Sequence, residues 1–333
     1  MDPLTHTATG LFLSRAGLNR WTPRATAILL VAANAPDADV VTALGGSLNY
    51  LHYHRHLTHS LLLMPVMALA SVAVVRFAGR KPVRWLPAFA IALVAVATHL
   101  LLDLTNIYGI RLLLPFSPRW LHLDQTSVID LWIWGFCLLS VAAPFLGRLV
   151  GSEISSGTVK RPHYGRGWAI VALAFLLLYN CGRAVLHAQA VASLESRVYQ
   201  EASALRTAAL PDPLNPWKWQ GLVETRDFYA VTDLNLATGD FDPTRAAIFH
   251  KPEPDPALDA ARRAHDVQEF LRFAQFPIWR ISPAPEPENA RRVDVIDMRF
   301  GTPAAPGFMA WAVIDSGLRL IGQGFTFGEA RPK

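Results

Sequence analysis

The sequence predicts an α-helical membrane bundle, with about four transmembrane helices and short N-terminal helices, followed by a small soluble α+β domain. Long uncharged apolar runs fill the region before residue 190, and ordinary charge density follows. Four apolar runs come in succession, interrupted by charge only at Asp130 and Arg183, and each is close to the roughly 20 residues with which a helix crosses a bilayer. We therefore divide the 333-residue chain into a membrane domain (1–190), a juxtamembrane helix and linker (191–216) and a soluble domain (217–333).

The predicted spans cover residues 61–75, 85–102, 128–146 and 168–186. A buried core helix could imitate one of them, but four in a row favour a membrane bundle. The first residues carry no basic segment ahead of an apolar run, so we expect no cleaved signal peptide. Cys137 and Cys181 lie in predicted spans and indicate neither a disulfide framework nor a metal-spaced pair.

The basic residues predict an orientation in the inner membrane. The loops after the first and third spans are rich in them: Arg76, Arg80, Lys81, Arg84, Arg148, Lys160, Arg161 and Arg166. Positively charged loops stay in the cytoplasm. We therefore expect a multi-pass protein whose soluble domain is periplasmic or extracellular, although Arg15, Arg20 and Arg24 in the N-terminal segment oppose this orientation. Because topology explains the net charge of +5, we expect no nucleic-acid partner.

Two short N-terminal segments precede the spans. Residues 3–18 are predicted as a helix with His6 near its start, in which Gly10 and Gly17 permit close approach of a neighbouring helix. An apolar run over 25–35 is too short to span, and it ends in Pro36-Asp37-Ala38-Asp39. Two carboxylates in a Pro-led turn form either a cation site or an ordinary solvated turn or helix cap.

Four histidines then fall within eight positions: His52, His54, His56 and His59. Tracts of this density mostly bind metal. If the stretch is helical, His52, His56 and His59 share one face, and the sequence leaves open whether His54 or His56 joins His59 as a ligand. Arg55 beside them offers a planar fork suited to a phosphate or carboxylate of a substrate.

The segment 97–109 organises the membrane domain, because it places His99 and Asp103 inside an otherwise apolar run. On a helix this spacing puts both side chains on one face, where one cation can take an imidazole nitrogen and a carboxylate oxygen. Ionisable groups at the end of a membrane helix are costly unless they are used. The alternative is an interfacial histidine and a helix-capping aspartate. Asp130, again an acid in an apolar run, is expected to face the same polar pocket.

The candidate ligands gather at one end of the predicted bundle: His6, Asp37, Asp39, His54, His59, His99 and Asp103. Mixed nitrogen and oxygen ligands suit one or two divalent metal ions, with Zn first and Mn or Fe next. A metal-activated water needs no protein nucleophile, and no Ser-His-Asp order or Gly-x-Ser-x-Gly elbow is present. We predict Asp39 or Asp130 as the proton acceptor, and Arg55 or Arg111 as the residue that holds the substrate anion.

Four motifs in this order resemble a known family: Asp2-Pro-Leu-Thr-His6, Pro36-Asp-x-Asp39, His54-Arg-x-x-Thr-His59-Ser60, and His99-x-x-x-Asp103 before Tyr108-Gly109. Over residues 1–150 they resemble the membrane-bound metal-dependent hydrolases, also described as LexA-binding, inner-membrane-associated hydrolases. The resemblance implies a metal site at His6, Asp37, Asp39, His59, His99 and Asp103. More distantly, the chain is similar to zinc-dependent phospholipase C, from which it departs because the membrane domain has no downstream His-x-x-x-Glu.

These observations predict a membrane-bound zinc hydrolase of a phosphoester, with a membrane lipid head group as the expected substrate. The alternative is a non-catalytic metal-binding scaffold or regulator whose protein partner binds the C-terminal domain. A cation transporter is less favoured, because its ionisable residues would lie at several membrane depths rather than at one end.

The soluble domain is expected to alternate strands with one helix. We predict a helix running on from the fourth span to Arg206, a strand and turn over 222–236, a helix from Pro256 to Ala274 and a strand over 293–300. A hairpin over 311–321 should turn at Asp315-Ser316-Gly317. Asp294 and Asp297 are expected to face solvent, and no catalytic motif is found in this half.

Overall fold

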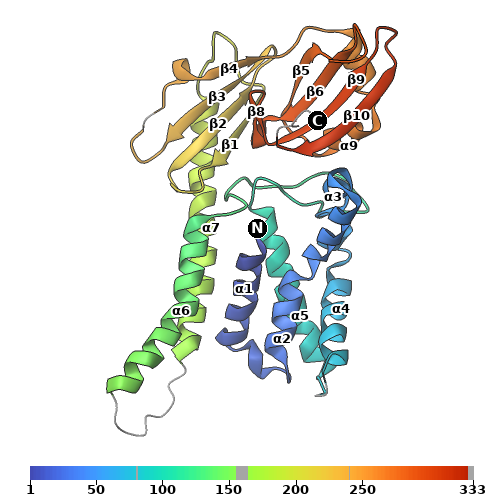
Figure 1. Cartoon of the computed structure of the whole chain (residues 1–333). Helices are drawn as coiled ribbons and strands as arrows, with labels where there is room; N and C mark the ends of the chain where they lie inside the picture. The colour runs from blue at the N-terminus through green and yellow to red at the C-terminus, as the bar shows by residue number, and fades with distance from the viewer. Residues whose placement is uncertain (80–81, 155–163, 240, 329–333) are drawn as a thin grey trace. The chain divides into compact units, whose positions relative to one another are not determined.

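The computed structural model describes residues 1–79, 82–154, 164–239 and 241–328. A helical N-terminal region is followed by a sheet-rich C-terminal domain (Figure 1). The chain divides into two compact units. The first comprises Met1–Asp39, Arg55–Ala188 and Pro211–Trp217, and the second comprises Val40–His54, Gln189–Leu210 and Lys218–Lys333. A short piece of the N-terminal region therefore packs with the C-terminal domain.

The helices of the N-terminal region are α1 (Pro3–Ala16), α2 (Ala25–Asn34), α4 (Met64–Phe77), α5 (Trp85–Leu104), α6 (Leu131–Ile154) and α7 (Tyr164–Glu195). Short 3-10 helices join them: η1 (Leu18–Arg20), η2 (Pro36–Gly45) and η3 (Leu57–His59). Helices α1, α2, α4 and α5 lie side by side (Figure 1). Small side chains such as Ala32 on α2 and Ala92 and Ala95 on α5 are fully buried in their common core.

Helix α1 begins where the sequence predicts and ends at Ala16, two residues before the predicted end. The Asp2 carboxylate accepts hydrogen bonds from the backbone N–H groups of Leu4 and Thr5, and Pro3 occupies the first turn, where no N–H is needed. Gly17 follows the helix, and its φ of 144° favours glycine. The predicted close approach at Gly10 is also present, because a Cβ there would lie 2.8 Å from the carbonyl oxygen of Leu29 on α2.

Two to four segments are long and apolar enough to cross a bilayer. Helices α5 and α7 meet this requirement alone, and two bent helix pairs, α2 with η2 and Ser47–His59 with α4, meet it if each pair is one span. The apolar part of α6 is shorter, over Leu131–Gly147. The N-terminal region is therefore helical and contains two to four candidate spans, while the count of four stays a prediction. Of the basic residues that predict the orientation, Arg80, Lys81, Lys160 and Arg161 lie outside the described residues.

The second unit contains two four-stranded sheets. The first has the order β1-β2-β3-β4, with β1 (Arg206–Pro211), β2 (Lys218–Glu224), β3 (Phe228–Asn235) and β4 (Ala247–His250). The second has the order β10-β9-β6-β5, with β5 (Pro277–Pro283), β6 (Arg291–Asp297), β9 (Phe308–Ile314) and β10 (Leu320–Phe327). Strands β7 (Gly301–Thr302) and β8 (Ala305–Pro306) form a small ribbon, and the helices are α3 (Ser47–Tyr53), α8 (Pro256–Ala261) and α9 (His265–Phe273).

Several predictions for the C-terminal half are confirmed and others are wrong. The hairpin of β9 and β10 turns at Asp315, whose carboxylate accepts hydrogen bonds from the N–H groups of Gly317 and Arg319. The single helix predicted to Ala274 is two helices, because Ala264 adopts an extended conformation between α8 and α9. Helix α7 ends at Glu195, and Arg206 begins a strand instead of ending a helix.

The two aspartates predicted at the surface are buried. Asp294 forms ion pairs with Arg280 and Arg292, and Asp297 forms one with the fully buried Arg299. Both lie on β6, the strand between β5 and β9, so paired arginines rather than water compensate their charge. Cys137 and Cys181 are free thiols, as expected.

Candidate metal centre

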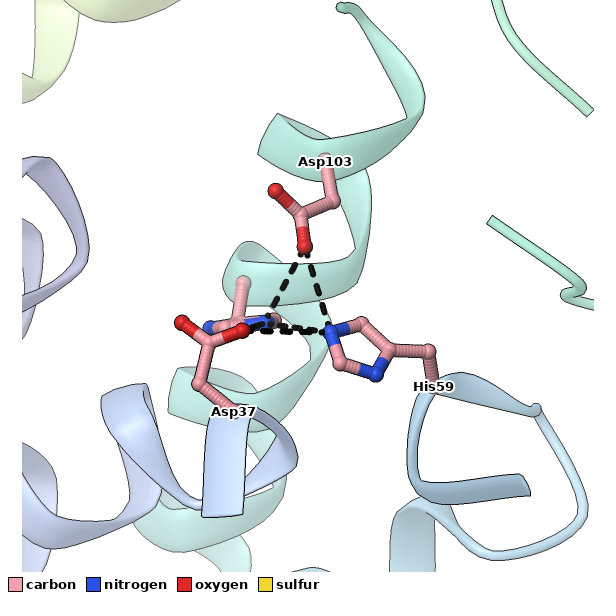
Figure 2. A group of neighbouring side chains, drawn as sticks. Asp37, His59 and Asp103 are labelled. Atoms are coloured by element: carbon pink, nitrogen blue, oxygen red, sulfur yellow. Dashed lines mark hydrogen bonds and ion pairs between the residues drawn. The ribbon is translucent and has the colours of Figure 1, made fainter. Parts of the chain in front are cut away.

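Three separate segments of the first unit bring four candidate ligands together. Asp37 lies in η2 directly after Pro36, His59 ends η3, and His99 and Asp103 lie one turn apart near the end of α5. Figure 2 shows the labelled side chains pointing toward one another. His59, His99 and Asp103 are fully buried, whereas the Asp37 side chain is 17% exposed. The group is therefore closed on the protein side and open to solvent at Asp37.

The four donor atoms all lie within 4.8 Å of one another, and five of their six separations are 3.1–3.7 Å. The Nε2 atoms of His59 and His99 are 3.1 Å apart, and Oδ2 of Asp103 lies 3.3 Å from each of them. Oδ1 of Asp37 lies 3.4 Å from Nε2 of His59 and 3.7 Å from Nε2 of His99. In a regular tetrahedron with such edges the centre is about 2 Å from each corner, which is the bond length of a divalent metal to nitrogen and oxygen ligands.

The partners of the two Nδ1 atoms, which point away from the centre, determine the tautomer of each histidine. Nδ1 of His99 is 2.8 Å from the carbonyl oxygen of Ala33, an atom that only accepts, so Nδ1 carries the proton. Nδ1 of His59 lies 3.3 Å from Oδ2 of Asp39 and 3.1 Å from the Thr58 hydroxyl oxygen. With both protons on the outer nitrogens, both Nε2 atoms present lone pairs to the centre. Such outer partners are typical of metal-binding histidines.

Converging lone pairs repel one another unless a cation lies among them. Oδ2 of Asp103 is buried and accepts no hydrogen bond from the residues that the structure describes. A buried carboxylate oxygen without a donor is costly. A divalent cation would remove this cost and the repulsion between the two imidazole nitrogens at once. The residues present therefore fit a metal ion in chemistry, spacing and burial.

The other oxygen of Asp103 is held by polar neighbours. Nη2 of Arg55 lies 3.0 Å from Oδ1, Nδ2 of Asn106 lies 3.5 Å from it, and the amino group of Met1 contacts it. Arg55 also donates to Oδ1 of Asn106 at 3.1 Å and to the Gly109 carbonyl at 3.2 Å, and it is only 3% exposed. In this structure Arg55 thus orients Asp103. Its predicted role toward a substrate anion stays a prediction.

Asp39 lies behind His59 and outside the group of four. Its Oδ2 accepts hydrogen bonds from the backbone N–H of Arg55 at 2.9 Å and from the Thr58 hydroxyl at 2.7 Å, in addition to the His59 contact. These contacts give Asp39 the position of a residue that orients a ligand. His54 belongs to the second unit, and its role as a ligand stays a prediction.

His6 and Asp130, also predicted at the site, have different surroundings. The His6 ring stacks on the His99 ring with centroids 3.7 Å apart, and its Nε2 lies 3.4 Å from Oδ1 of Asp103. Burial lowers the pKa of His6 well below 6.5, so its ring is neutral at pH 7. Asp130 directly precedes α6 and accepts hydrogen bonds from the N–H of Ile133 and the Tyr179 hydroxyl. It is not in the group of four.

The sequence comparisons agree with a membrane domain that carries this group. The profile of the family described as YdjM inner membrane protein matches residues 1–190. The chain belongs to this YdjM family. It is also similar to the uncharacterized protein YfhP of Bacillus subtilis (strain 168), with 24% identity over 308 residues that cover 91% of this chain and 86% of the relative. No solved structure matches the chain.

The matched YdjM region contains the four candidate ligands and also partners that sequence reasoning missed. These are Asn106 and the backbone carbonyl of Ala33. Asn106 follows Asp103 by three residues, so the sequence places it near a ligand without revealing its bond. The Ala33 carbonyl has no side-chain signal at all.

Proposed function

We propose that this YdjM family member is a membrane-bound, metal-dependent hydrolase that cleaves a phosphoester such as a lipid head group. The observation that carries the proposal is the convergence of four donor atoms from Asp37, His59, His99 and Asp103, with both imidazoles fixed from behind. This arrangement meets the two requirements of a functional metal site, a matched donor set and oriented ligands.

We infer that zinc is the preferred ion, because two imidazoles and two carboxylates at this spacing suit its tetrahedral coordination. Bound zinc lowers the pKa of a coordinated water to about 7 and polarises a phosphoryl oxygen. Among the four ligands Asp37 is the one that solvent reaches. Asp37 is therefore the candidate residue to share its position with water and to accept the proton of that water.

The remaining residues maintain the ligands rather than react. Arg55 and Asn106 hold one oxygen of Asp103, so the other oxygen stays directed at the centre. Asp39 keeps the proton of His59 on Nδ1. His6, neutral and stacked on His99, is available for a second ion that would share Asp103. A second ion would give the site the two-metal form that is common among phosphoester hydrolases.

A lipid substrate is favoured by the helix that carries the site. His99 and Asp103 lie near the end of α5, one of the two helices that can cross a bilayer alone. The end of a span lies near the head groups of the bilayer. A phosphoester in a head group would therefore reach the site without leaving the membrane, as in the phospholipase C enzymes to which the motif is distantly similar.

A second function has its own supporting observation. Four protein donors already complete a tetrahedron, and structural zinc sites are closed in this way whereas catalytic sites keep one position open. A closed site would make the protein a metal-stabilised scaffold or regulator. Its C-terminal domain would then bind a protein partner.

Metal analysis and hydrolysis assays separate the two functions. We expect detergent-purified protein to contain at least one zinc per chain and to cleave a phosphodiester, either bis(4-nitrophenyl) phosphate or phospholipid in mixed micelles. His99→Ala and Asp103→Asn should lose both properties. His250→Ala, which removes an exposed histidine of the second unit, should keep both.

Two results would contradict the proposals. Protein that binds no stoichiometric divalent metal would exclude both the hydrolase and the scaffold. Bound metal without turnover on any phosphodiester, together with loss of stability in His99→Ala, would favour the scaffold.

A further inference from the structure

The segment 40–54, here called the handle, connects two parts of the candidate metal centre. Asp37 and Asp39 precede it, and Arg55 and His59 follow it. The chain leaves the first unit after Asp39, packs with the second unit through the handle and returns to the first unit at Arg55. The segment that links Asp37 and Asp39 to Arg55 and His59 along the chain is therefore part of the second unit.

The base of the handle is part of the metal centre. The backbone N–H of Arg55 donates to Oδ2 of Asp39 at 2.9 Å, so the two residues that flank the handle are hydrogen bonded to each other. The same carboxylate oxygen accepts from Thr58 and faces Nδ1 of His59. Arg55 has a φ of 57°, which a non-glycine residue keeps only where its surroundings enforce it. Movement at this base would reorient His59.

The C-terminal domain holds the other end of the handle by polar and aromatic contacts. In α3, Nδ1 of His52 lies 2.6 Å from Oε2 of Glu269 on α9. The Ser47 hydroxyl donates to the carbonyl of Phe325 on β10 at 3.1 Å. The Tyr50 ring meets the edge of Phe327, also on β10, with centroids 5.9 Å apart. All these contacts lie within the second unit.

The contact of Glu269 is the strongest of the three. Its side chain is only 10% exposed, and its other oxygen accepts from Arg272 one turn away at 2.7 Å. A carboxylate fixed in this way on a helix presents a preoriented acceptor to His52. Hydrogen bonds to an ionised group are about twice as strong as those between neutral groups.

We propose that the C-terminal domain sets the geometry of the metal centre through the handle, with Glu269 as the main positioning residue. The inference rests on the metal centre of the proposed function. The YdjM profile ends at residue 190, so the sheet domain lies outside the matched region, yet it holds a segment that lies inside that region. A change in the C-terminal domain, such as the binding of a partner, would thereby reach the ligands.

The physical basis is preorganisation. A free loop of this length samples many conformations, and ordering it on metal binding would cost conformational entropy. A handle that is already ordered by its packing with the C-terminal domain loses no further conformational entropy when the metal binds. This preorganisation raises the metal affinity. Loosening the handle should therefore weaken binding and alter the coordination, although no ligand has been changed.

The test uses the full-length protein in detergent with Glu269→Gln, which keeps the size of the side chain and removes its charge. We expect zinc affinity, measured by chelator competition, to fall about fivefold or more, the usual lower range for coupling between distant sites. The visible absorption spectrum of the Co²⁺-substituted protein should also change, because it reports ligand geometry. Combining Glu269→Gln with His52→Asn should lower the zinc affinity little further, because both substitutions remove the same contact between His52 and Glu269.

Asp259→Asn is the matched control, because Asp259 on α8 forms an exposed ion pair with Arg262 that lies outside the contacts described for the handle. It should keep the wild-type affinity and spectrum. If Glu269→Gln does not fold, Ser47→Ala removes a weaker contact between the handle and the C-terminal domain. It should lower the zinc affinity and change the Co²⁺ spectrum in the same direction. Folded variants of both kinds with unchanged affinity and spectrum would overturn the inference while leaving the metal centre intact. Absence of metal from the wild type would overturn both.

Discussion

At the scale of single residues, the position of one proton on each imidazole decides what the site can bind. The Ala33 carbonyl and the Asp39 carboxylate hold the outer nitrogens of His99 and His59, so both inner nitrogens are free bases toward Asp37 and Asp103. The same ring with its proton on Nε2 would be a donor and would reject a cation. The site is therefore defined as much by these outer partners as by its ligands.

This distinction gives a prediction for Asp39. We expect Asp39→Asn to lower zinc affinity about 10-fold to 100-fold, the range for loss of an outer partner, because an amide supports the required tautomer less well. Asp103→Asn, which removes a ligand, should abolish stoichiometric binding. Titration with a fluorescent zinc indicator measures both. Complete loss of the metal in the Asp39→Asn variant would instead identify Asp39 as a ligand.

The sequence predicted the essential pair at this scale and missed its partners. His99 and Asp103 were visible because two ionisable residues at helical spacing stand in an apolar run. The distinction between Asp37, which faces the centre, and Asp39, which faces away from it, was not visible. It depends on the 3-10 conformation of η2, which the pattern Pro-Asp-Ala-Asp does not specify.

At the scale of elements, the site depends on how closely α1, α2 and α5 pack. Gly10 on α1 lies against the Leu29 carbonyl and the Ala33 side chain on α2, and the carbonyl of Ala33 holds His99 on α5. A contact between two helices therefore supports a ligand on a third. Burial in such a packed core leaves little room for adjustment.

Gly10→Ala tests this dependence. The added Cβ would lie 2.8 Å from the Leu29 oxygen and 3.0 Å from Cβ of Ala33, so α2 must shift. We expect the free energy of unfolding to fall by about 1–3 kcal/mol, as for other overpacked cores, and zinc affinity to fall with it. Gly182→Ala on α7 is the control, because its Cβ would meet no atom within 4 Å. Equal thermal unfolding of the two variants would contradict the account.

The predicted helix through the histidine cluster shows why some elements cannot be derived from pattern alone. His52, His56 and His59 would share a face on one helix, but α3 ends at Tyr53 and η3 begins at Leu57. The break contains Arg55 at positive φ, a conformation for which an arginine gives no sequence signal. His59 consequently joins Asp37 in the first unit, whereas His52 joins Glu269 in the second.

At the scale of the whole molecule, the distribution of apolar and charged residues along the chain predicted a membrane half and a soluble half. It did not predict that 40–54, a segment of the first half, packs with the second. Hydropathy separates the two halves because it is a local property of the sequence. The packing of 40–54 with the C-terminal domain depends on contacts between residues more than 200 positions apart, such as that of His52 with Glu269 at a separation of 217. Such contacts leave no periodic pattern.

The orientation of the C-terminal domain is a prediction at this scale. The positively charged loops favour a periplasmic location for it. We expect alkaline phosphatase fused after residue 328 to be active and green fluorescent protein at the same place to be dark when exported through the Sec pathway. A fusion to the loop after α4 should give the opposite pair of results. A fluorescent C-terminal fusion would reverse the assigned orientation.

The central claim is that Asp37, His59, His99 and Asp103 jointly bind one divalent metal ion. X-ray absorption at the zinc edge of the loaded, detergent-solubilised protein tests it most directly. The account predicts four nitrogen or oxygen ligands at about 2.0–2.2 Å, with scattering from two imidazole rings and none from sulfur. His99→Ala should bind no stoichiometric zinc and should therefore lose this signal. A spectrum with sulfur ligands, without imidazole scattering, or unchanged in His99→Ala would contradict the claim.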